Sequence, residues 1–402
     1  MPGISSTIFT PEIIRDPHPT LALLREEAPV FWDERIGSWL VTRYDDVKTV
    51  YADDRFSRDR RLGRHFVAPA PGSWAERFDQ NGLGRTEGEE HRRWRARLAK
   101  GFTPRAVARM EDQVRAVVAE LADPLRDRRG VVDLVDAFTN PIPNTVISRI
   151  TGIPPYPGEE ERFRRLAQDV IRRFLPMADE ANVRRGENAI GELAEWVGKL
   201  AEERRQEPRE DLVSDLIHGN PDDPMTNLDI VLLVALLIAA GSETTTLAGT
   251  HALRLLLRNP EQLAHLRRDP GLVRTAVREV LRFGFGSAGG GVPRYAMQDL
   301  EIRGQRIRQA DMVMLSLAAA NRDPEVFADP DRFDVTRDNR DMLAFGSGPH
   351  YCLGANLALQ ELTCMVEAAL AFLPEDATLL EDRIEWEIVG LICRPVALPV
   401  RF

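Results

Sequence analysis

The spacing of apolar residues along the chain predicts a protein that is mostly helical. From about Ala106 onward apolar side chains recur three and four positions apart, most regularly in residues 111–125 and 186–205. The segment 139–161 interrupts this spacing with prolines, which predicts one helix flanked by turns. A longer helix is indicated over residues 226–259. Its first half is apolar on every side, as expected of a helix that runs through the core.

Alternating apolar and polar residues predict short strands in other parts of the chain. Residues 29–42 indicate a hairpin around Arg35–Gly37, and a helix is expected to begin at residues 44–46 with an aspartate at its cap. The period of two returns on both sides of Gly304 and again in residues 384–402. These strands are short and few, so they predict minor sheets at the edges of a helical body.

The predicted fold class is therefore mainly α with small β-sheets (α+β). No internal repeat or linker divides the chain, so we expect a single domain over residues 1–402. The chain has 53 Lys and Arg and 63 Asp and Glu, and a net charge of −10 argues against nucleic-acid binding. Three cysteines fit a reducing compartment, and we expect a cytoplasmic protein. The N-terminus shows no secretory signal, and the longest apolar run, Ile230–Ala240, is too short for a membrane anchor.

A polar stretch interrupts the apolar pattern of the long helix at residues 240–246, which are Ala-Gly-Ser-Glu-Thr-Thr-Thr. Glycine costs a helix about 1 kcal/mol relative to alanine, and an unpaired buried carboxylate costs more. One interpretation is a kinked helix whose threonines bond back to carbonyl groups, with Glu243 at the surface. The other is that helix regularity is given up to admit a ligand and a path for protons.

A glycine-rich loop around Cys352 is the strongest chemical signal in the chain. Residues 345–354 read FGSGPHYCLG, and an amphipathic helix follows them. A cysteine just before a helix N-terminus is expected to favour the thiolate, which is either a nucleophile or a metal ligand. No zinc-ligand spacing is present, and His350 is too close in sequence to be placed as the base of a cysteine hydrolase. A single thiolate suits a metal whose other ligands come from a cofactor, as in haem.

These motifs together resemble those of the cytochromes P450. Residues 345–354 match the haem-binding pattern F-G-x-G-x-H-x-C-x-G at every specified position. Residues 240–244 are similar to the family's oxygen-activation segment A-G-x-(D/E)-T, residues 279–282 to its E-x-x-R pair, and residues 91–95 to the helix that contacts the haem propionates. The motifs stand in the family's order, and the match spans roughly residues 20–400. The resemblance implies the cytochrome P450 fold, with a long central helix over a buried haem.

The resemblance implies haem b as the cofactor and gives roles to single residues. Cys352 would be the axial ligand of the haem iron. Three residues of the same loop would lie close to the haem: Phe345, Gly346 and Gly354. The haem propionates need cations, and the candidates are His91, Arg95, Arg294 and His350.

Two further pairs of residues receive roles from the same resemblance. Glu243 and Thr244 would be the catalytic residues over the distal face of the haem. Thr244 would supply a hydrogen bond to the dioxygen that is reduced, and Glu243 would supply protons through water. Glu279 and Arg282, three positions apart on one helix, would form a buried structural pair rather than a surface salt bridge.

The activity that the resemblance implies is that of a soluble bacterial haem-thiolate monooxygenase. Such an enzyme activates O2 with two electrons and hydroxylates or epoxidises an apolar small molecule, such as a terpenoid, steroid, polyketide or aromatic compound. A ferredoxin with its NAD(P)H-dependent reductase would supply the electrons, and the basic residues Arg92, Arg93 and Arg97 are either a solvated face or a docking site for an acidic redox partner. A peroxygenase driven by hydrogen peroxide and a haem-binding recruitment domain without oxygen chemistry stay open as alternatives.

One segment departs from the family pattern. The glycine-rich residues 286–291 precede Arg294, which stands later in the chain than the corresponding arginine of family members. Because this segment lines the substrate pocket in the family, its lack of side chains predicts a roomier or more mobile pocket. Further pocket residues are expected in Leu62–Arg85, in roughly Pro176–Arg185 and in Gly286–Val292.

Overall fold

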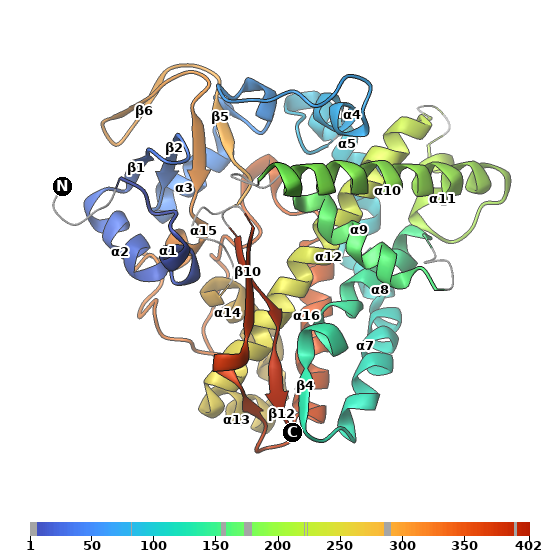
Figure 1. Cartoon of the computed structure of the whole chain (residues 1–402), viewed down its shortest axis with the longest axis vertical. Helices are drawn as coiled ribbons and strands as arrows, with labels where there is room; N and C mark the ends of the chain where they lie inside the picture. The colour runs from blue at the N-terminus through green and yellow to red at the C-terminus, as the bar shows by residue number, and fades with distance from the viewer. Residues whose placement is uncertain are drawn as a thin grey trace.

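The computed structural model describes residues 6–81, 83–153, 158–172, 179–220, 222, 224–284, 291–389 and 392–402. Figure 1 shows a large body of helices and, beside it, a smaller region in which N-terminal strands lie next to strands from around residue 300. The C-terminal strands run along the helical body. The predicted fold class, mainly α with small sheets, is confirmed.

Helix α12 (Asn227–Arg258) is the central element of the helical body, and its bounds agree with the prediction. Thr226 Oγ1 accepts a hydrogen bond from Asp229 N at 3.2 Å, and Asp229 Oδ2 accepts one from Thr226 N at 2.9 Å, so two backbone donors at the helix start are satisfied. Helices α8, α9, α10, α14 and α16 pack around α12. Among the described residues α12 alone is long and apolar enough to cross a membrane, but 61% of its most apolar stretch is buried inside the fold.

The other helices cover α12 or connect it to the strands. Their bounds are α1 (Pro11–Arg15), α2 (His18–Glu27), α3 (Tyr44–Ala52), α4 (Trp74–Gln80), α5 (Gly88–Ala99), α6 (Pro104–Arg109), α7 (Glu111–Arg126), α8 (Pro141–Thr151), α9 (Glu160–Arg172), α10 (Glu180–Gln206), α11 (Leu212–His218), α13 (Pro260–Arg268), α14 (Val273–Gly284), α15 (Leu317–Ala320) and α16 (Ala355–Phe372). The helices expected in residues 111–125, 139–161 and 186–205 are confirmed by α7, α8 and α10.

The start of α3 differs from the prediction of an aspartate cap. Its N-cap is Arg43, whose side chain makes no capping hydrogen bond. The first free backbone donor, Tyr44 N, instead donates to Asp323 Oδ2 at 3.0 Å, from a segment far along the chain. A tertiary contact therefore replaces the local cap, and no local pattern could have indicated it.

The strands form small sheets, of which the largest shapes one side of the molecule. Its strand order is β1-β2-β8-β5-β3, and β2 pairs with β8 in parallel, with Leu40 beside Met314. The hairpin around Arg35–Gly37 is confirmed by β1 and β2, and the strands around Gly304 are confirmed by β6 and β7. The bounds are β1 (Val30–Asp33), β2 (Ser38–Val41), β3 (Phe56–Ser57), β4 (Val131–Asp133), β5 (Arg294–Ala296), β6 (Leu300–Ile302), β7 (Gln305–Ile307), β8 (Met312–Leu315), β9 (Thr378–Leu379), β10 (Glu385–Val389), β11 (Ile392–Ala397) and β12 (Pro399–Arg401).

A buried ion pair joins α14 to the segment that leads to the cysteine loop. Glu279 and Arg282 have side chains with no exposed area, and they share two hydrogen bonds of 2.7 and 2.9 Å. Arg282 also donates to the carbonyl oxygens of Asn321 and Pro330, each at 2.9 Å. Glu279 accepts further hydrogen bonds from Asn339 Nδ2 and Asp334 N. The predicted buried structural pair is confirmed, and it fixes residues 321–339 against α14.

Candidate functional site

The cysteine loop is held tightly against α3. Cys352 N donates to Phe345 O at 2.9 Å, and Gly346 N donates to Leu343 O at 2.8 Å. Gly348 has a φ of +70°, and a Cβ built on it would lie 2.6 Å from the carbonyl oxygen of Tyr51. Only glycine fits there, because both the backbone conformation and the space exclude a side chain. Phe345 packs on the main apolar core and Gly354 is the N-cap of α16, so the loop ends at the helix predicted to follow it.

The environment of Cys352 favours the neutral thiol, contrary to the expectation from the helix terminus alone. The side chain is exposed by its accessible area. Enough protein surrounds the sulfur, however, that burial raises the pKa of the thiol. The Gly354 N–H and the charges of Arg95 and Arg58 lower that pKa without offsetting the burial. The fold by itself therefore does not lower the pKa of Cys352 as a helix terminus alone would, and a bound metal ion would supply the charge that favours the thiolate.

A cluster of cationic and neutral basic side chains lies beside the cysteine loop. His91 of α5 is 3% exposed, and its ring centroid is 4.0 Å from that of His350. Burial, His350 and Arg95 lower the pKa of His91 to about 4. Arg294 of β5 is also 3% exposed and lies over the Tyr51 ring at 4.8 Å. The four predicted propionate contacts, His91, Arg95, Arg294 and His350, thus come together from different parts of the chain.

Arg58 is a fifth member of this cluster that the sequence did not indicate. Burial and then the charge of Arg294 lower the pKa of Arg58 to about 10. Its guanidinium lies 3.1 Å from His350 Nδ1, and its Nε is buried without a hydrogen-bond partner among the described residues. Nothing in the sequence singled it out, because five arginines stand within residues 55–64. Only its position after β3 brings it into the cluster.

The charge balance of the cluster fits the two carboxylates of a haem. Glu87 is the carboxylate that acts on these groups, and its Oε2 lies 2.7 Å from His350 Nε2. The described cluster thus contains one carboxylate, Glu87, and three arginines, Arg58, Arg95 and Arg294. It is therefore short of negative charge. Cations that are shielded from water need anionic partners, and Arg58 Nε donates a hydrogen bond to none of the described residues. The residues present therefore fit the group that the cysteine loop implies.

Two residues of α12 are exposed in the middle of a mostly buried helix. Ala240 and Thr244 are exposed although most of their neighbours in the helix are buried, and both line a large cavity. The helix continues without a break through residues 240–246. Thr244 Oγ1 donates to Ala240 O at 2.6 Å. The predicted back-bonding of a threonine is thus confirmed, whereas the predicted loss of helix regularity is wrong.

Glu243 is turned away from the cavity that Thr244 lines. Its side chain is buried, so the interpretation that places it at the surface is wrong, and it forms an ion pair with Arg394 of β11. Thr244 lines the large cavity and Glu243 does not. Glu243 faces a second, smaller cavity of about 190 Å³, which Asn140, Gln168 and Thr246 also line. Glu243 Oε2 and Thr246 Oγ1 are buried there without a hydrogen-bond partner among the described residues.

Arg394 connects Glu243 to helices α9 and α10. It bonds Glu387 of β10 through Nε at 2.8 Å, and Glu387 lies 3.1 Å from Arg172 of α9. Arg172 in turn bonds Asp169 at 2.9 Å and the side-chain oxygen of Asn182 in α10 at 2.8 Å. Glu243 is therefore at one end of a chain of ion pairs that passes through the β10–β11 hairpin to Arg172. No sequence pattern pointed to Arg394.

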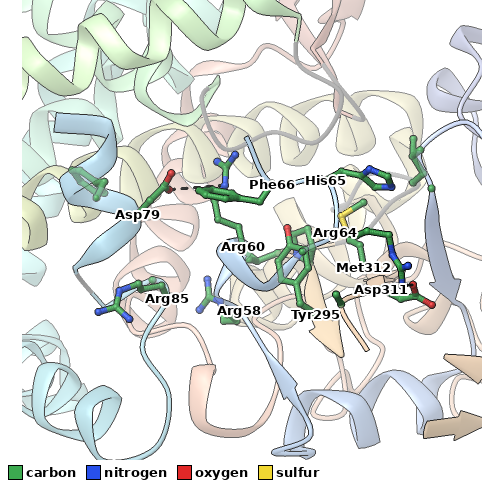
Figure 2. A pocket seen from close by; sticks show the side chains of 18 of the residues that line it. Arg58, Arg60, Arg64, His65, Phe66, Asp79, Arg85, Tyr295, Asp311 and Met312 are labelled. Carbon is green, nitrogen blue, oxygen red and sulfur yellow. Dashed lines mark hydrogen bonds and ion pairs between the residues drawn. The ribbon is translucent and has the colours of Figure 1, made fainter. Parts of the chain in front are cut away.

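The large cavity has a volume of about 1040 Å³, at the upper end of the range of ligand sites. Figure 2 shows its charged and aromatic residues, among them Arg60, Phe66, Asp79 and Tyr295. The predicted pocket segment Leu62–Arg85 is confirmed, and Val292 also lines the cavity. Helix α9 lines it instead of the described residues 179–185. Residues 176–178 and 285–290 lie outside the described residues, so the roomier pocket predicted for 286–291 stays a prediction.

Two wall segments of the cavity were not predicted. Trp32, Ile36 and Trp39 come from the hairpin of β1 and β2, and residues 306–312 come from β7 and the start of β8. The parallel pairing of β2 with β8 brings these segments together. Such pairing between distant segments leaves no local signal in the sequence.

A family model described as cytochrome P450 matches residues 27–372. The chain belongs to the cytochrome P450 family. This cytochrome P450 is an oxidoreductase with haem b as its cofactor, a haem-thiolate monooxygenase of the bacterial type. It is 35% identical to nocardicin C N-oxygenase of Nocardia uniformis subsp. tsuyamanensis, over 98% of this chain and 97% of that protein. It is 36% identical to 6-deoxyerythronolide B hydroxylase of Saccharopolyspora erythraea, over 95% of each.

Solved structures place this cytochrome P450 in the same family. P450BioI in complex with an acyl carrier protein that carries hexadec-9Z-enoic acid has a TM-score of 0.88 at 28% identity, and the match covers 97% of this chain and 100% of that chain. Epothilone D-bound P450epoK has a TM-score of 0.87 at 30% identity and is covered over 99% of each chain. The expected fold, a long central helix in the cytochrome P450 arrangement, is thereby confirmed.

Proposed function

We propose that Cys352 is the axial ligand through which this monooxygenase holds haem iron, and that Phe345, Gly346 and Gly354 shape the loop around it. The observation that carries the proposal is the cluster of buried and half-buried arginines beside Cys352, which is short of negative charge and contains Arg58 Nε, a donor without a partner among the described residues. His91, Arg95, Arg294, His350 and Arg58 would bind the propionates. When bound, haem supplies the iron at which dioxygen is activated with two electrons.

Thr244 and Glu243 would supply a hydrogen bond and protons on the two sides of α12. The Thr244 hydroxyl is exposed to the large cavity and can turn from Ala240 O towards a bound molecule. Glu243 can take up protons in the smaller cavity, where its free Oε2 lies with Asn140, Gln168 and Thr246. To deliver a proton towards Thr244, Glu243 must leave Arg394, and the carboxylate would then act as a mobile proton carrier.

The cysteine assignment is tested with the purified holoprotein. Cys352→Ser is expected to abolish the thiolate-type absorption band of the reduced carbon monoxide complex and the monooxygenase activity. Cys393→Ser in β11 is the matched control, since Cys393 is also a free cysteine and is expected to leave both unchanged. An unchanged carbon monoxide spectrum in Cys352→Ser would show that the sulfur is not the iron ligand.

Electrons would reach the haem from a ferredoxin that docks on α5. Arg92 and Arg93 of this helix are exposed, whereas His91 beside them is buried within the cation cluster. One helix can thus bind haem on its inner side and an acidic ferredoxin on its outer side. We also propose that the protein works in the cytoplasm, as one domain, with a ferredoxin reductase that uses NAD(P)H, and that its substrate is an apolar organic molecule.

Charge reversal on α5 tests the redox partner. Arg92→Glu with Arg93→Glu is expected to slow turnover with reduced ferredoxin by about tenfold, while turnover with hydrogen peroxide stays unchanged. A variant that keeps its ferredoxin rate would rule out docking at α5. If the unmodified protein turned over with peroxide and not with any reduced ferredoxin, the peroxygenase alternative would replace the monooxygenase cycle.

A further inference from the structure

Glu87 stands at the start of helix α5 but does not cap it. It occupies the N-cap position, and its side chain makes no capping hydrogen bond. A capping side chain contributes about 1 kcal/mol to a helix, so this carboxylate gives up a local role. It bonds instead to residues 57–58 at the end of β3 and to His350 of the cysteine loop. The helix that Glu87 precedes therefore does not explain where its carboxylate lies.

The two carboxylate oxygens of Glu87 have different partners. Oε1 accepts hydrogen bonds from the backbone N–H of Arg58 at 2.7 Å and from Ser57 Oγ at 3.2 Å. Oε2 lies 2.7 Å from Nε2 of His350, whose side chain is 5% exposed. Although burial raises the pKa of Glu87, its hydrogen bonds with His350 and the Arg58 backbone lower it below 4.5, so the carboxylate is ionised at neutral pH. One charged group thus joins the end of β3 to the loop that carries Cys352.

The partners of His350 determine which ring nitrogen carries the hydrogen. An ionised carboxylate only accepts hydrogen bonds, so Nε2 carries the hydrogen that Glu87 accepts. A guanidinium only donates, so Nδ1 is the acceptor for Arg58 Nη1, which lies 3.1 Å away. One neutral form of the ring satisfies both contacts. In this form His350 has no hydrogen left to donate to a propionate.

Arg58 is therefore held at both ends. Glu87 accepts from its backbone N–H, and His350, which Glu87 fixes, accepts from its guanidinium. Within the described residues Nη1 is the one guanidinium nitrogen of Arg58 with a hydrogen-bond partner, and Nε is buried without one. Arg58 also lines the large cavity, where Figure 2 shows it. An arginine that is already ordered loses little further conformational entropy when an anion binds it.

The charges in this cluster argue against a merely structural contact. Glu87 and His350 could join α5 to the cysteine loop without an arginine. Arg58 nevertheless adds a third guanidinium to those of Arg95 and Arg294. Burial, and then the charge of Arg294, lower the pKa of Arg58 to about 10, so the fold keeps this cation at a cost. A carboxylate that bound Arg58 would offset that cost.

We propose that Glu87 is a positioning residue for the haem, which holds Arg58 through His350 so that the Arg58 guanidinium binds one propionate. The inference rests on the proposed function, because a propionate is the anion that haem brings to this cluster. It gives Glu87 a role in cofactor binding. It also makes the contribution of His350 to propionate binding an indirect one, through Arg58.

The test is the rate at which haem leaves the holoprotein, measured by absorbance as haem transfers to excess apomyoglobin. Glu87→Gln keeps the size of the side chain but has one acceptor oxygen. With that oxygen on the Arg58 backbone, the amide N–H groups face His350 Nε2 and favour the other neutral form, whose Nδ1–H opposes Arg58. Haem release is expected to become about tenfold faster, and Arg58→Gln should accelerate it to a similar extent.

The double variant separates positioning from a structural role. Because Glu87 acts through Arg58, Glu87→Gln should add little to the rate of haem release in an Arg58→Gln background. Independent contributions would instead multiply to about a hundredfold and would overturn the inference, as would unchanged release in Glu87→Gln alone. The matched control is Glu89→Gln in the first turn of the same helix. The Glu89 side chain is 94% exposed, and its loss should leave haem release unchanged.

Two further measurements do not depend on how well the variants fold. The ¹⁵N signals of His350 in the reduced carbon monoxide complex of the wild type should show the hydrogen on Nε2, and a hydrogen on Nδ1 would contradict the inference. Wild-type protein that holds the dimethyl ester of haem has no propionate charge for Arg58. It should lose the ester about tenfold faster than haem, and Glu87→Gln should lose the ester no faster than the wild type does. Faster loss of the ester from Glu87→Gln would assign Glu87 to the fold and not to the propionate.

These results separate the inference from the proposed function. The variants at positions 58 and 87 should keep the thiolate-type band of the reduced carbon monoxide complex, because Cys352 is unchanged in them. Wild-type rates of haem release with that band intact would overturn the role of Glu87 alone. An unchanged spectrum in Cys352→Ser would overturn the iron ligand, whereas the release rates of Glu87→Gln and Arg58→Gln would still decide the inference.

Discussion

Two buried glutamate–arginine pairs of this cytochrome P450 differ in how completely their polar atoms are satisfied. In the Glu279–Arg282 pair both carboxylate oxygens accept hydrogen bonds, and the guanidinium bonds three carbonyl groups as well. In the Glu243–Arg394 pair, Glu243 Oε2 has no hydrogen-bond partner in the described part of the chain, and Glu243 lines a cavity. The first pair has no atom left to react, whereas the second keeps one free. The two pairs are alike in burial, so the unsatisfied oxygen is what distinguishes the acid proposed to carry protons from the structural one.

The largest effect is expected from Glu279→Gln. This change leaves Arg282 as an unpaired charge with no exposed area, so the free energy of unfolding should fall by about 3–5 kcal/mol. Urea denaturation followed by circular dichroism measures the loss, with the exposed Glu385→Gln as the control. A loss below 1 kcal/mol, in the range of surface substitutions, would remove the contrast between the two pairs.

Glu243→Gln should affect catalysis rather than stability. Arg394 keeps Glu387 as its partner, so little stability is lost, while ferredoxin-driven turnover should fall about a hundredfold because the proton source is gone. Product formation is measured beside oxygen consumption at equal haem content. A variant with normal product formation and a strongly lowered unfolding free energy would make Glu243 a second structural acid.

A double-mutant cycle sharpens the same comparison. Arg394→Gln alone should lower the unfolding free energy by about 2 kcal/mol, because Glu243 and Glu387 lose their shared cation. Combined with Glu243→Gln, it should show a coupling energy of about 1 kcal/mol. The corresponding cycle for Glu279 and Arg282 should give a larger coupling. Equal couplings would mean that the unpartnered oxygen of Glu243 has no energetic consequence.

The smallest effect concerns a histidine on the same helix as Glu243. Burial, and then Arg254, lower the pKa of His251 from 6.5 to about 4. Between these values the unfolded chain binds a proton that the folded chain does not, so stability is lost as the pH falls from 6.5 towards 4. His251→Asn should reduce this loss by about 1 kcal/mol at pH 6. If the unfolding free energy of the variant fell with pH as steeply as that of the wild type, other groups would cause the loss.

Local patterns predicted the elements of this fold well and their contacts poorly. The ends of α12 follow from Thr226, Asp229 and the proline after Asn259, and the loop of Cys352 follows from its glycines. These signals act between residues close in sequence. The direction of Glu243 depends instead on Arg394, which lies 151 positions away.

The same limit applies to the candidate site. His91, Arg95, Arg294 and His350 could be named because they belong to a family motif, but their role as propionate contacts stays a proposal. Arg58 could not be named, since its neighbours in sequence are also arginines and only the fold selects one of them. The single domain over residues 1–402 likewise stays a prediction.

The pairing of β2 with β8 has a consequence for biosynthesis. During synthesis, residues 38–41 leave the ribosome long before their pairing partners, residues 312–315. Until β8 is made, strand β2 therefore has unpaired backbone groups along one edge, close to the indole rings of Trp32 and Trp39. Closure of so long a loop is slow, and the outer side of the cavity is completed only after three quarters of the polypeptide has been made. Nascent chains halted before Met312 should therefore be targets for chaperones.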